Sequence, residues 1–261
     1  MGKLLRISIV VFSLALSQAD IASGSTFKVA PIKVYLTAQS PTSLLTLTNT
    51  TDQPLRFQIS AFSWSQSRAG ELELAPTEDI IFFPALLTLK AGEERNVRVG
   101  YTKRVAPPLE QAYRIFFEEL PSADAATAGG AQIKVLTKMG IPIFIAPKQA
   151  APRVALTQTA WKDRSIAFAV ENQGNAHFTI RSVKVTGRNA SGSELFSRQF
   201  DGWYVLPRGA RDYVVSVTPK ECSALTDIDV QLSTDLVGEL PAQVIRWKAP
   251  AQFCQASVRR P

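Results

Sequence analysis

Hydrophobic and polar residues alternate along this chain in short stretches that turn-forming residues separate. Leu45 and Leu47 precede the turn-rich segment 49–54, and the alternation resumes from Leu55 to Ile59. A period of two residues is typical of a β-strand, and no segment carries a helical period over about ten residues. The sequence therefore predicts an all-β protein. Further strands are predicted over Phe27–Leu36, Asn96–Tyr101, Tyr113–Leu120, Ile133–Ile145, Ser165–Val170, Phe178–Val185, Asp212–Val217, Ile228–Leu232 and Gln243–Trp247.

The two halves of the chain repeat one pattern. At an offset of 123, Leu45, Leu47, Asn49, Asp52, Leu55 and Phe57 align on Phe168, Val170, Asn172, Asn175, Phe178 and Ile180. At an offset of 117, Leu89, Gly92 and Val97 align on Leu206, Gly209 and Val214. Two matches in the same order predict two β-sandwich domains of immunoglobulin-like size, 25–147 and 148–261, with Pro147–Pro152 as the linker.

The N-terminus predicts export. Lys3 and Arg6 precede an uncharged run from Ile7 to Leu16, which is too short to cross a bilayer, and small residues follow it. Residues 1–24 are therefore predicted to be a signal peptide, with an N-terminal strand as the alternative. No later hydrophobic stretch has the length of a membrane span, so we expect an exported protein without membrane insertion.

The composition limits the partners and the kinds of reaction that this protein could have. The chain has 29 basic and 22 acidic residues, and export makes nucleic acid an unlikely partner for this basic balance. A single histidine, His177, lies in a predicted turn without nearby metal-ligating residues, and we expect it to pack rather than to bind a ligand. The sequence thus predicts no enzyme, no metal site and no cofactor. An exported hydrolase would need a nucleophile and a base, and only this histidine could serve it.

The two cysteines are predicted to pair. Cys222 and Cys254 would lie in an oxidising compartment, where a disulfide closing a loop of about 33 residues could stabilise the fold by roughly 3–4 kcal/mol. Two buried free thiols are the alternative.

The segment from Gln132 to Ile145 is the most informative for function. Ile133, Val135, Thr137, Met139, Ile141, Ile143 and Ile145 share one face, and that face is apolar except at Thr137. An interior strand is one interpretation. Pro142 argues against it for half of the run, since proline cannot donate to a sheet and is tolerated mainly at edges. An exposed apolar edge can instead recruit a strand of another chain.

Several separated motifs follow one another in a characteristic order. They are Val29–Val34, Leu47–Thr50, Phe62–Trp64, Phe83–Pro84, Leu89–Gly92, Val97–Val99, Tyr113–Pro121, Ile141–Pro147 and Asn172–His177. Together they resemble the periplasmic chaperones of the chaperone–usher pilus pathway over nearly the whole mature chain. The last motif is similar to its counterpart in the archaic branch of that family.

The resemblance implies two immunoglobulin-like domains in an L, and a periplasmic protein that binds pilin subunits and delivers them to an outer-membrane usher without nucleotide or metal. Binding would use donor-strand complementation, in which a chaperone strand fills the groove of an incomplete pilin. The positions that match the family's groove-filling residues are Ile133, Val135, Thr137 and Met139. A secreted adhesive or structural module is the alternative, and it predicts that segment 132–145 is buried in its own domain.

The resemblance also implies a basic anchor for the pilin's C-terminal carboxylate. Lys33 stands where the family usually has Arg, and Lys138 matches a basic position of the archaic branch, with Lys134 as the competing candidate. In the better-known members the last-strand lysine falls at the position of Pro142.

A second departure concerns the ion pairs that join the domains in those members. Glu110 and Asp235 match the acidic positions, but Ala146 stands in place of the arginine. The domain orientation is therefore expected to be held differently or more loosely.

Overall fold

The computed structural model describes residues 27–121, 135–236, 243–250 and 253–254. The strands before residue 150 are β1 (Phe27–Ala30), β2 (Val34–Leu36), β3 (Thr42–Asn49), β4 (Leu55–Gln66), β5 (Leu72–Pro76), β6 (Ile80–Phe83), β7 (Leu86–Leu89), β8 (Glu94–Tyr101), β9 (Gln111–Leu120) and β10 (Lys138–Ile145). The later elements are β11 (Val154–Lys162), β12 (Ser165–Asn172), β13 (Phe178–Arg188), β14 (Glu194–Asp201), β15 (Tyr204–Val205), β16 (Ala210–Ser216), α1 (Pro219–Cys222), β17 (Asp227–Thr234) and β18 (Gln243–Lys248).

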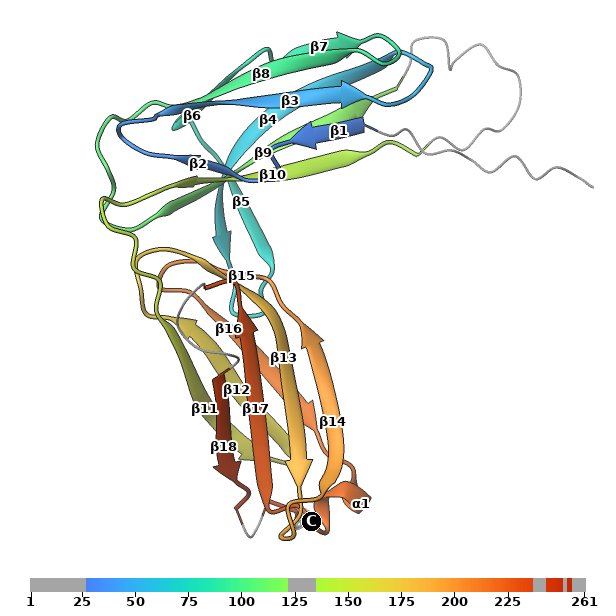
Figure 1. Cartoon of the computed structure of the whole chain (residues 1–261), viewed down its shortest axis with the longest axis vertical. Helices are drawn as coiled ribbons and strands as arrows, with labels where there is room; N and C mark the ends of the chain where they lie inside the picture. Colours follow the sequence, from blue (N-terminus) through green and yellow to red (C-terminus); the bar gives the residue numbers. More distant parts are fainter. Residues whose placement is uncertain (1–26, 122–134, 237–242, 251–252, 255–261) are drawn as a thin grey trace, which may run out of the picture.

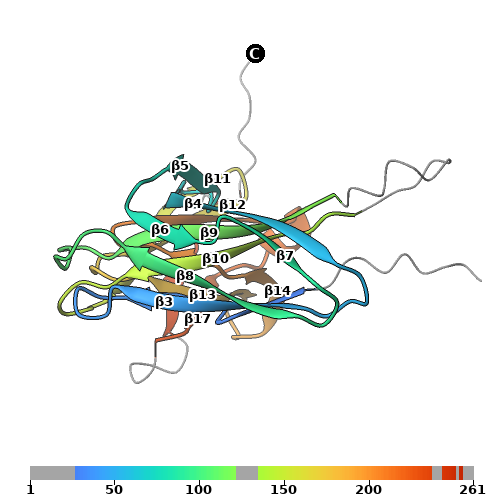
Figure 2. The ribbon, with the colours of Figure 1, turned by 90° about the horizontal axis from the view of Figure 1, so that it is seen from above.

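Strands β1–β10 form two sheets that enclose one core, which we call the first sandwich. One sheet has the order β1-β3-β8-β6, and the other has the order β2-β10-β9-β4-β5, with β7 also paired to β4. Alternate residues of both sheets point inward, among them Leu45, Phe57 and Ile143, which are fully buried. Seen from above, these strands run side by side along the domain (Figure 2).

Strands β11–β18 form the second sandwich around a separate core. Its sheets have the orders β11-β12-β16 and β14-β13-β17-β18, and β15 pairs with β13. The fold is thus all-β, as predicted, and the two sandwiches meet at an angle to form an L (Figure 1). The predicted boundary after residue 147 falls between β10 and β11.

Some predicted strands differ from the observed ones. The strand expected over Phe27–Leu36 is interrupted at Pro31, and its two parts, β1 and β2, pair in different sheets. The run expected over Ile133–Ile145 is a strand only from Lys138, and Ile133 lies outside the described residues. The prediction missed β5, β6, β7, β11, β14 and β15.

The internal repeat corresponds to equivalent turns in the two sandwiches. Asn49 donates its side-chain N–H to the carbonyl of Gln53, and Asn172 donates in the same way to the carbonyl of Ala176. Each asparagine also accepts a hydrogen bond from the backbone N–H two residues later. Both side chains are buried, so these bonds satisfy polar groups that burial would otherwise leave unpaired.

The β4–β5 hairpin extends from the first sandwich to the second (Figure 1). Arg68 in its turn makes a two-pronged ion pair with Asp212, with N–O distances of 2.7 and 3.0 Å, and its carbonyl accepts from the Asp212 backbone N–H. Gln66 donates to the carbonyl of Tyr204 and accepts from the N–H of Leu206. The hairpin therefore supplies a connection between the domains that the sequence did not predict.

Two of the residues considered for the interdomain ion pairs take different roles. The Glu110 carboxylate accepts from the backbone N–H of His177 at 2.9 Å and lies 2.6 Å from that residue's Nδ1. Asp235 accepts from the backbone N–H of Thr179 inside the second sandwich. His177 stacks on Phe144 with ring centroids 3.7 Å apart. The domain orientation is thus held differently, which is one of the two expected outcomes, through Glu110, His177 and the β4–β5 hairpin.

The predicted disulfide is present and joins Cys222 of α1 to Cys254. The neighbouring Phe253 is buried against Trp161, with ring centroids 4.8 Å apart. The predicted signal peptide lies outside the described residues. In the part of the chain that the structure covers, no helix has the length and apolar character needed to cross a membrane.

Candidate functional site

Strand β10 has a partner on both sides over only part of its length. Its whole length pairs with β9, from Lys138 opposite Glu118 to Ile145 opposite Gln111. On the other side β2 pairs only with Ile143–Ile145. Among the described residues no strand pairs with that side of β10 from Lys138 to Pro142, so its backbone is available to an added strand there.

The predicted shared face of this segment is present in the strand. Met139 packs against the core of the first sandwich, and Ile141, Ile143 and Ile145 are buried in it. Before the strand begins, Val135 is 61% exposed and Leu136 is 41% exposed. Exposed apolar side chains thus precede the strand whose apolar face enters the core. This observation disagrees with a segment that is wholly buried in its own domain.

Pro142 marks the point where the second partner of β10 ends. It lies opposite Arg114 of β9, and the next residue, Ile143, pairs with Val34 of β2. Continuing this parallel register by one residue places Lys33, directly before Val34, beside Pro142 on its other side. Adjacent strands lie about 4.8 Å apart, so roughly 10 Å separates the backbones of Lys33 and Arg114.

Arg114 is a cation in an apolar setting. Its side chain points away from the core of the first sandwich, and its guanidinium lies 4.5 Å from the Trp64 ring centroid and 5.6 Å from that of Trp203. Burial lowers the pKa of the guanidinium, and Nε is buried without a hydrogen-bond partner. No described carboxylate lies within ion-pair distance of Arg114.

Lys33 also lacks a described carboxylate partner. Its ammonium lies 4.9 Å from the centroid of the Tyr204 ring, which belongs to the second sandwich. Tyr35, two residues later on the same face, stacks on Phe144 at 5.6 Å. Lys33 therefore lies at the junction of the two sandwiches, where an anionic group would meet a cation that is not neutralised.

Lys138 lies in a different environment. It forms an ion pair with its cross-strand neighbour Glu118 at 2.8 Å, and half of its side chain is exposed. It shares the outward face of β10 with Pro142, but four residues of strand separate the two, which is about 13 Å. Lys134, the competing candidate, lies outside the described residues.

Sequence reasoning did not single out Arg114, Trp203 or Tyr204. Arg114 lies inside the motif Tyr113–Pro121, where it is the one basic residue among aromatic and aliphatic neighbours. That pattern could have drawn attention to it, because an arginine that aromatic neighbours bury is costly unless a partner faces it. The two aromatic residues could not have been placed beside it without the arrangement of the domains.

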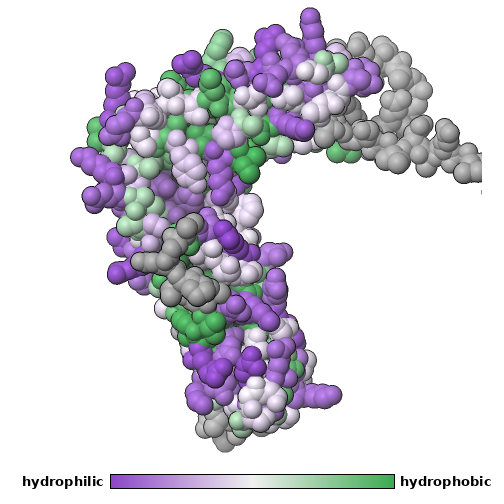
Figure 3. Space-filling view, in the orientation of Figure 1, coloured by the Kyte–Doolittle hydropathy of each residue, from purple (hydrophilic) through white to green (hydrophobic). Residues whose placement is uncertain are grey.

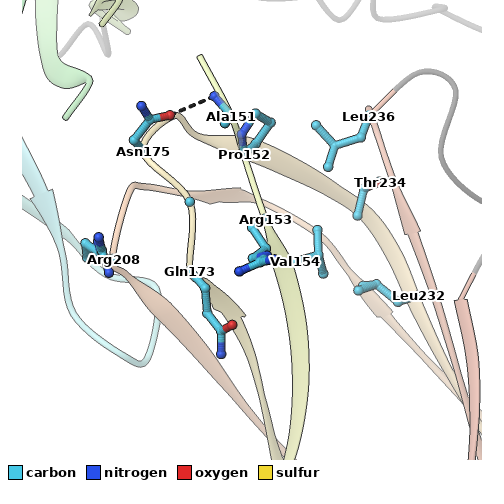
Figure 4. A pocket seen from close by; sticks show the side chains of 11 residues that line it. Ala151, Pro152, Arg153, Val154, Gln173, Asn175, Arg208, Leu232, Thr234 and Leu236 are labelled. Carbon is cyan, nitrogen blue, oxygen red and sulfur yellow. Dashed lines mark hydrogen bonds between the residues drawn. The ribbon is translucent and has the colours of Figure 1, made fainter. Parts of the chain in front are cut away.

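The inner side of the bend carries both hydrophobic and hydrophilic residues (Figure 3). A separate cavity of about 500 Å³ lies at the start of the second sandwich, and its lining includes Arg153, Gln173, Leu232 and Leu236 (Figure 4). Among the described residues that line it there is no acid, histidine or cysteine.

Comparison with known proteins identifies the first sandwich. Residues 26–151 match the family described as pili and flagellar-assembly chaperone, PapD N-terminal domain. No curated protein matches the chain in a sequence comparison. The first sandwich therefore belongs to the family of PapD N-terminal domains of pilus-assembly chaperones.

Solved structures share the whole two-domain fold. The class 5 fimbriae chaperone CfaA has a TM-score of 0.56 and 15% identity, and the match covers 86% of this chain and 100% of that one. A chain of the CsuC–CsuE chaperone–tip adhesion subunit complex, from archaic chaperone–usher Csu pili of Acinetobacter baumannii, has a TM-score of 0.56 and 17% identity, with 85% and 98% covered. A chain of the Salmonella enterica SafA pilin complex with the SafB chaperone has a TM-score of 0.53 and 15% identity, with 86% and 97% covered.

Proposed function

We propose that this protein captures a pilin subunit by strand addition at the open side of β10. The observation that carries the proposal is the one-sided pairing of Lys138–Pro142 with β9. An incomplete subunit exposes a hydrophobic groove, and an added strand would cover that groove while main-chain hydrogen bonds complete its sheet. Structures of similar fold that contain a pilin or an adhesin subunit support a partner of this kind.

The groove-filling side chains are those on the core-facing side of the strand and of the residues before it. We assign this role to Ile133, Val135, Thr137 and Met139, as the family match suggests. The exposure of Val135 supports the assignment, because an apolar side chain that its own domain does not cover is available to a partner. Thr137 would contribute a weaker contact than a larger apolar residue.

The subunit's C-terminal carboxylate would bind beside Pro142. Lys33 is one cation of this anchor, and Arg114 is better placed than Lys138 to be the second. Arg114 shares a row of the sheet with Lys33, whereas Lys138 lies farther along β10 and pairs with Glu118. Each charge-assisted hydrogen bond to the carboxylate would contribute about 1.5–3 kcal/mol if water is excluded.

Transfer of the subunit to an outer-membrane usher, in the periplasm, completes the proposed function. Final folding of the subunit, when a neighbouring subunit replaces the chaperone strand, would supply the free energy, so that no nucleotide is needed. The exposed Val135 and Leu136 favour this function over a secreted adhesive module, which would bury the segment within its own sandwich.

Co-expression with a candidate pilin tests the proposal. The mature chain and a pilin encoded nearby are purified together and analysed by size-exclusion chromatography, in parallel with Lys33→Ala. Lys28→Ala, at an exposed position of β1, is the matched control. A soluble one-to-one complex that Lys33→Ala alone weakens supports capture and anchoring. Aggregation or degradation of each candidate pilin, despite a folded chain, argues for the adhesive module.

A further inference from the structure

The two cations beside Pro142 are both held by aromatic rings of the second sandwich. The Lys33 ammonium faces Tyr204, and the Arg114 guanidinium lies near Trp203 as well as Trp64 of its own sandwich. Tyr204 begins β15 and Trp203 directly precedes it, and their rings meet edge to face at 5.4 Å. One short segment of the second sandwich thus contacts both cations.

Resting on the proposed function, we infer that the second sandwich completes the carboxylate anchor: Trp203 and Tyr204 are positioning residues that hold Arg114 and Lys33 ready for the subunit's C-terminus. An aromatic face attracts a cation without neutralising it. A carboxylate in the same place would form an ion pair and compete with the incoming carboxylate. The rings therefore orient the two side chains and leave their N–H donors free for the ligand.

The backbone of this aromatic segment is fixed from both sides. Gln66 of β4 donates to the carbonyl of Tyr204 at 3.1 Å and accepts from the N–H of Leu206 at 3.2 Å. Within the second sandwich, the Trp203 carbonyl accepts from the N–H of Ile180 at 2.9 Å. The Tyr204 ring also meets the Trp64 ring edge to face at 5.3 Å. These contacts fix the position of the Trp203 and Tyr204 rings relative to the first sandwich.

The burial of Arg114 is a second reason why aromatic rings are needed to position it. Arg114 is largely buried, and its Nε finds no hydrogen-bond partner among the described residues. A guanidinium in that state is costly unless a partner arrives, so its position must be maintained by contacts other than hydrogen bonds. The rings of Trp64 and Trp203 make such contacts with the Arg114 guanidinium.

The test compares full-length variants that remove or retain each ring. Trp203→Leu and Tyr204→Leu remove the aromatic faces, whereas Trp203→Phe and Tyr204→Phe retain a ring. The probe is a synthetic peptide of alternating valine and serine residues, about ten residues long. It is used in one form with a free C-terminal carboxylate and in a second form with a C-terminal amide. Isothermal titration gives the affinity ratio of the two forms for each variant.

The wild-type chain should bind the carboxylate form roughly tenfold or more tightly than the amide form. Each leucine variant should reduce that ratio by about three- to tenfold, and the phenylalanine variants should largely restore it. A merely structural role would weaken both peptide forms equally. Equal weakening, or an unchanged ratio, overturns the inference and leaves the proposed function standing. A wild-type chain that does not prefer the carboxylate form overturns the proposed anchor and this inference together.

Discussion

Lys33 and Arg114 lie on either side of Pro142 on one face of one sheet, and neither has a carboxylate partner among the described residues. By contrast, some other cations of the first sandwich have carboxylate partners. Lys138 pairs with Glu118, and Arg68 pairs with Asp212. A pair of cations without counter-charges, next to an open strand edge, is the feature that the proposed carboxylate anchor explains.

Replacing Arg114 should weaken the capture of a subunit while changing the stability of the fold only a little. The Arg114→Met variant removes a buried charge whose pKa burial already lowers, and methionine can fill much of the same volume. We expect its free energy of unfolding to fall by no more than about 1 kcal/mol, the size of the lost contact with the rings. Capture of a subunit should weaken roughly tenfold or more.

Denaturant unfolding and a subunit binding assay measure the two quantities for Arg114→Met. Arg98→Met, on the exposed face of β8, is the control that should change neither. A large loss of stability with unchanged capture would mean that Arg114 serves the fold and not the anchor.

A charge on the exposed part of the apolar segment should abolish capture without unfolding the protein. Val135 is 61% exposed, and Val244 on β18 provides a matched control because it is 60% exposed. Val135→Asp and Val244→Asp should therefore both remain folded by circular dichroism. Only Val135→Asp should fail to keep a co-expressed pilin soluble, since an aspartate would be desolvated in the pilin's groove. Equal capture by the two variants would exclude Val135 from the binding strand.

The second sandwich should lose stability in acid through Asp229. Arg246 and Arg188 hold the pKa of its carboxyl below the ordinary value of 3.8. Because the folded-state pKa is lowered, this carboxylate stabilises the fold above pH 3.8, and that contribution is lost as the pH falls below this value.

Asp229→Asn tests this dependence. The variant should be less stable than wild type by about 1–3 kcal/mol at neutral pH, and the difference should shrink in acid. Urea unfolding across the acid range measures it. A difference that stays constant down to the lowest pH would show that protonation of Asp229 is not responsible.

The disulfide should stabilise the second sandwich and leave capture unaffected. Cys222→Ser with Cys254→Ser opens the link between α1 and the chain's end, and the free energy of unfolding should fall by about 3–4 kcal/mol. The strand edge and both anchor cations lie in the first sandwich, so subunit capture at low temperature should persist. Unchanged stability would mean that packing around Phe253, which is buried, already holds this end of the chain.

The sequence contained enough local information to predict most of the fold. Asn49 and Asn172 recur because each closes the same turn through its own side chain, and such short-range bonds leave a readable pattern. The alternation from Met139 to Ile145 likewise predicted which face of β10 enters the core. Short strands such as β5 and β7 were missed because pairing with β4, rather than their own pattern, creates them.

The candidate site was less predictable because its contacts join distant parts of the chain. Lys33 could be selected from its motif, but the ring of Tyr204 beneath it comes from the other sandwich. Arg114 could be recognised as a candidate anchor residue only from the strand register, which places it opposite Pro142. Spacing in one sequence does not reveal which residues a domain junction brings together.

Hydrogen exchange along β10 detects the addition of a strand to its open side. Amides in residues 135–142 are measured in the free protein and in its complex with a co-expressed pilin, and the edge strand β14 serves as the internal reference. Strand addition predicts a large gain in protection in residues 135–142 and no gain in β14, because new main-chain hydrogen bonds form only at the open side of β10. A stable complex in which residues 135–142 exchange as fast as in the free protein would contradict the account.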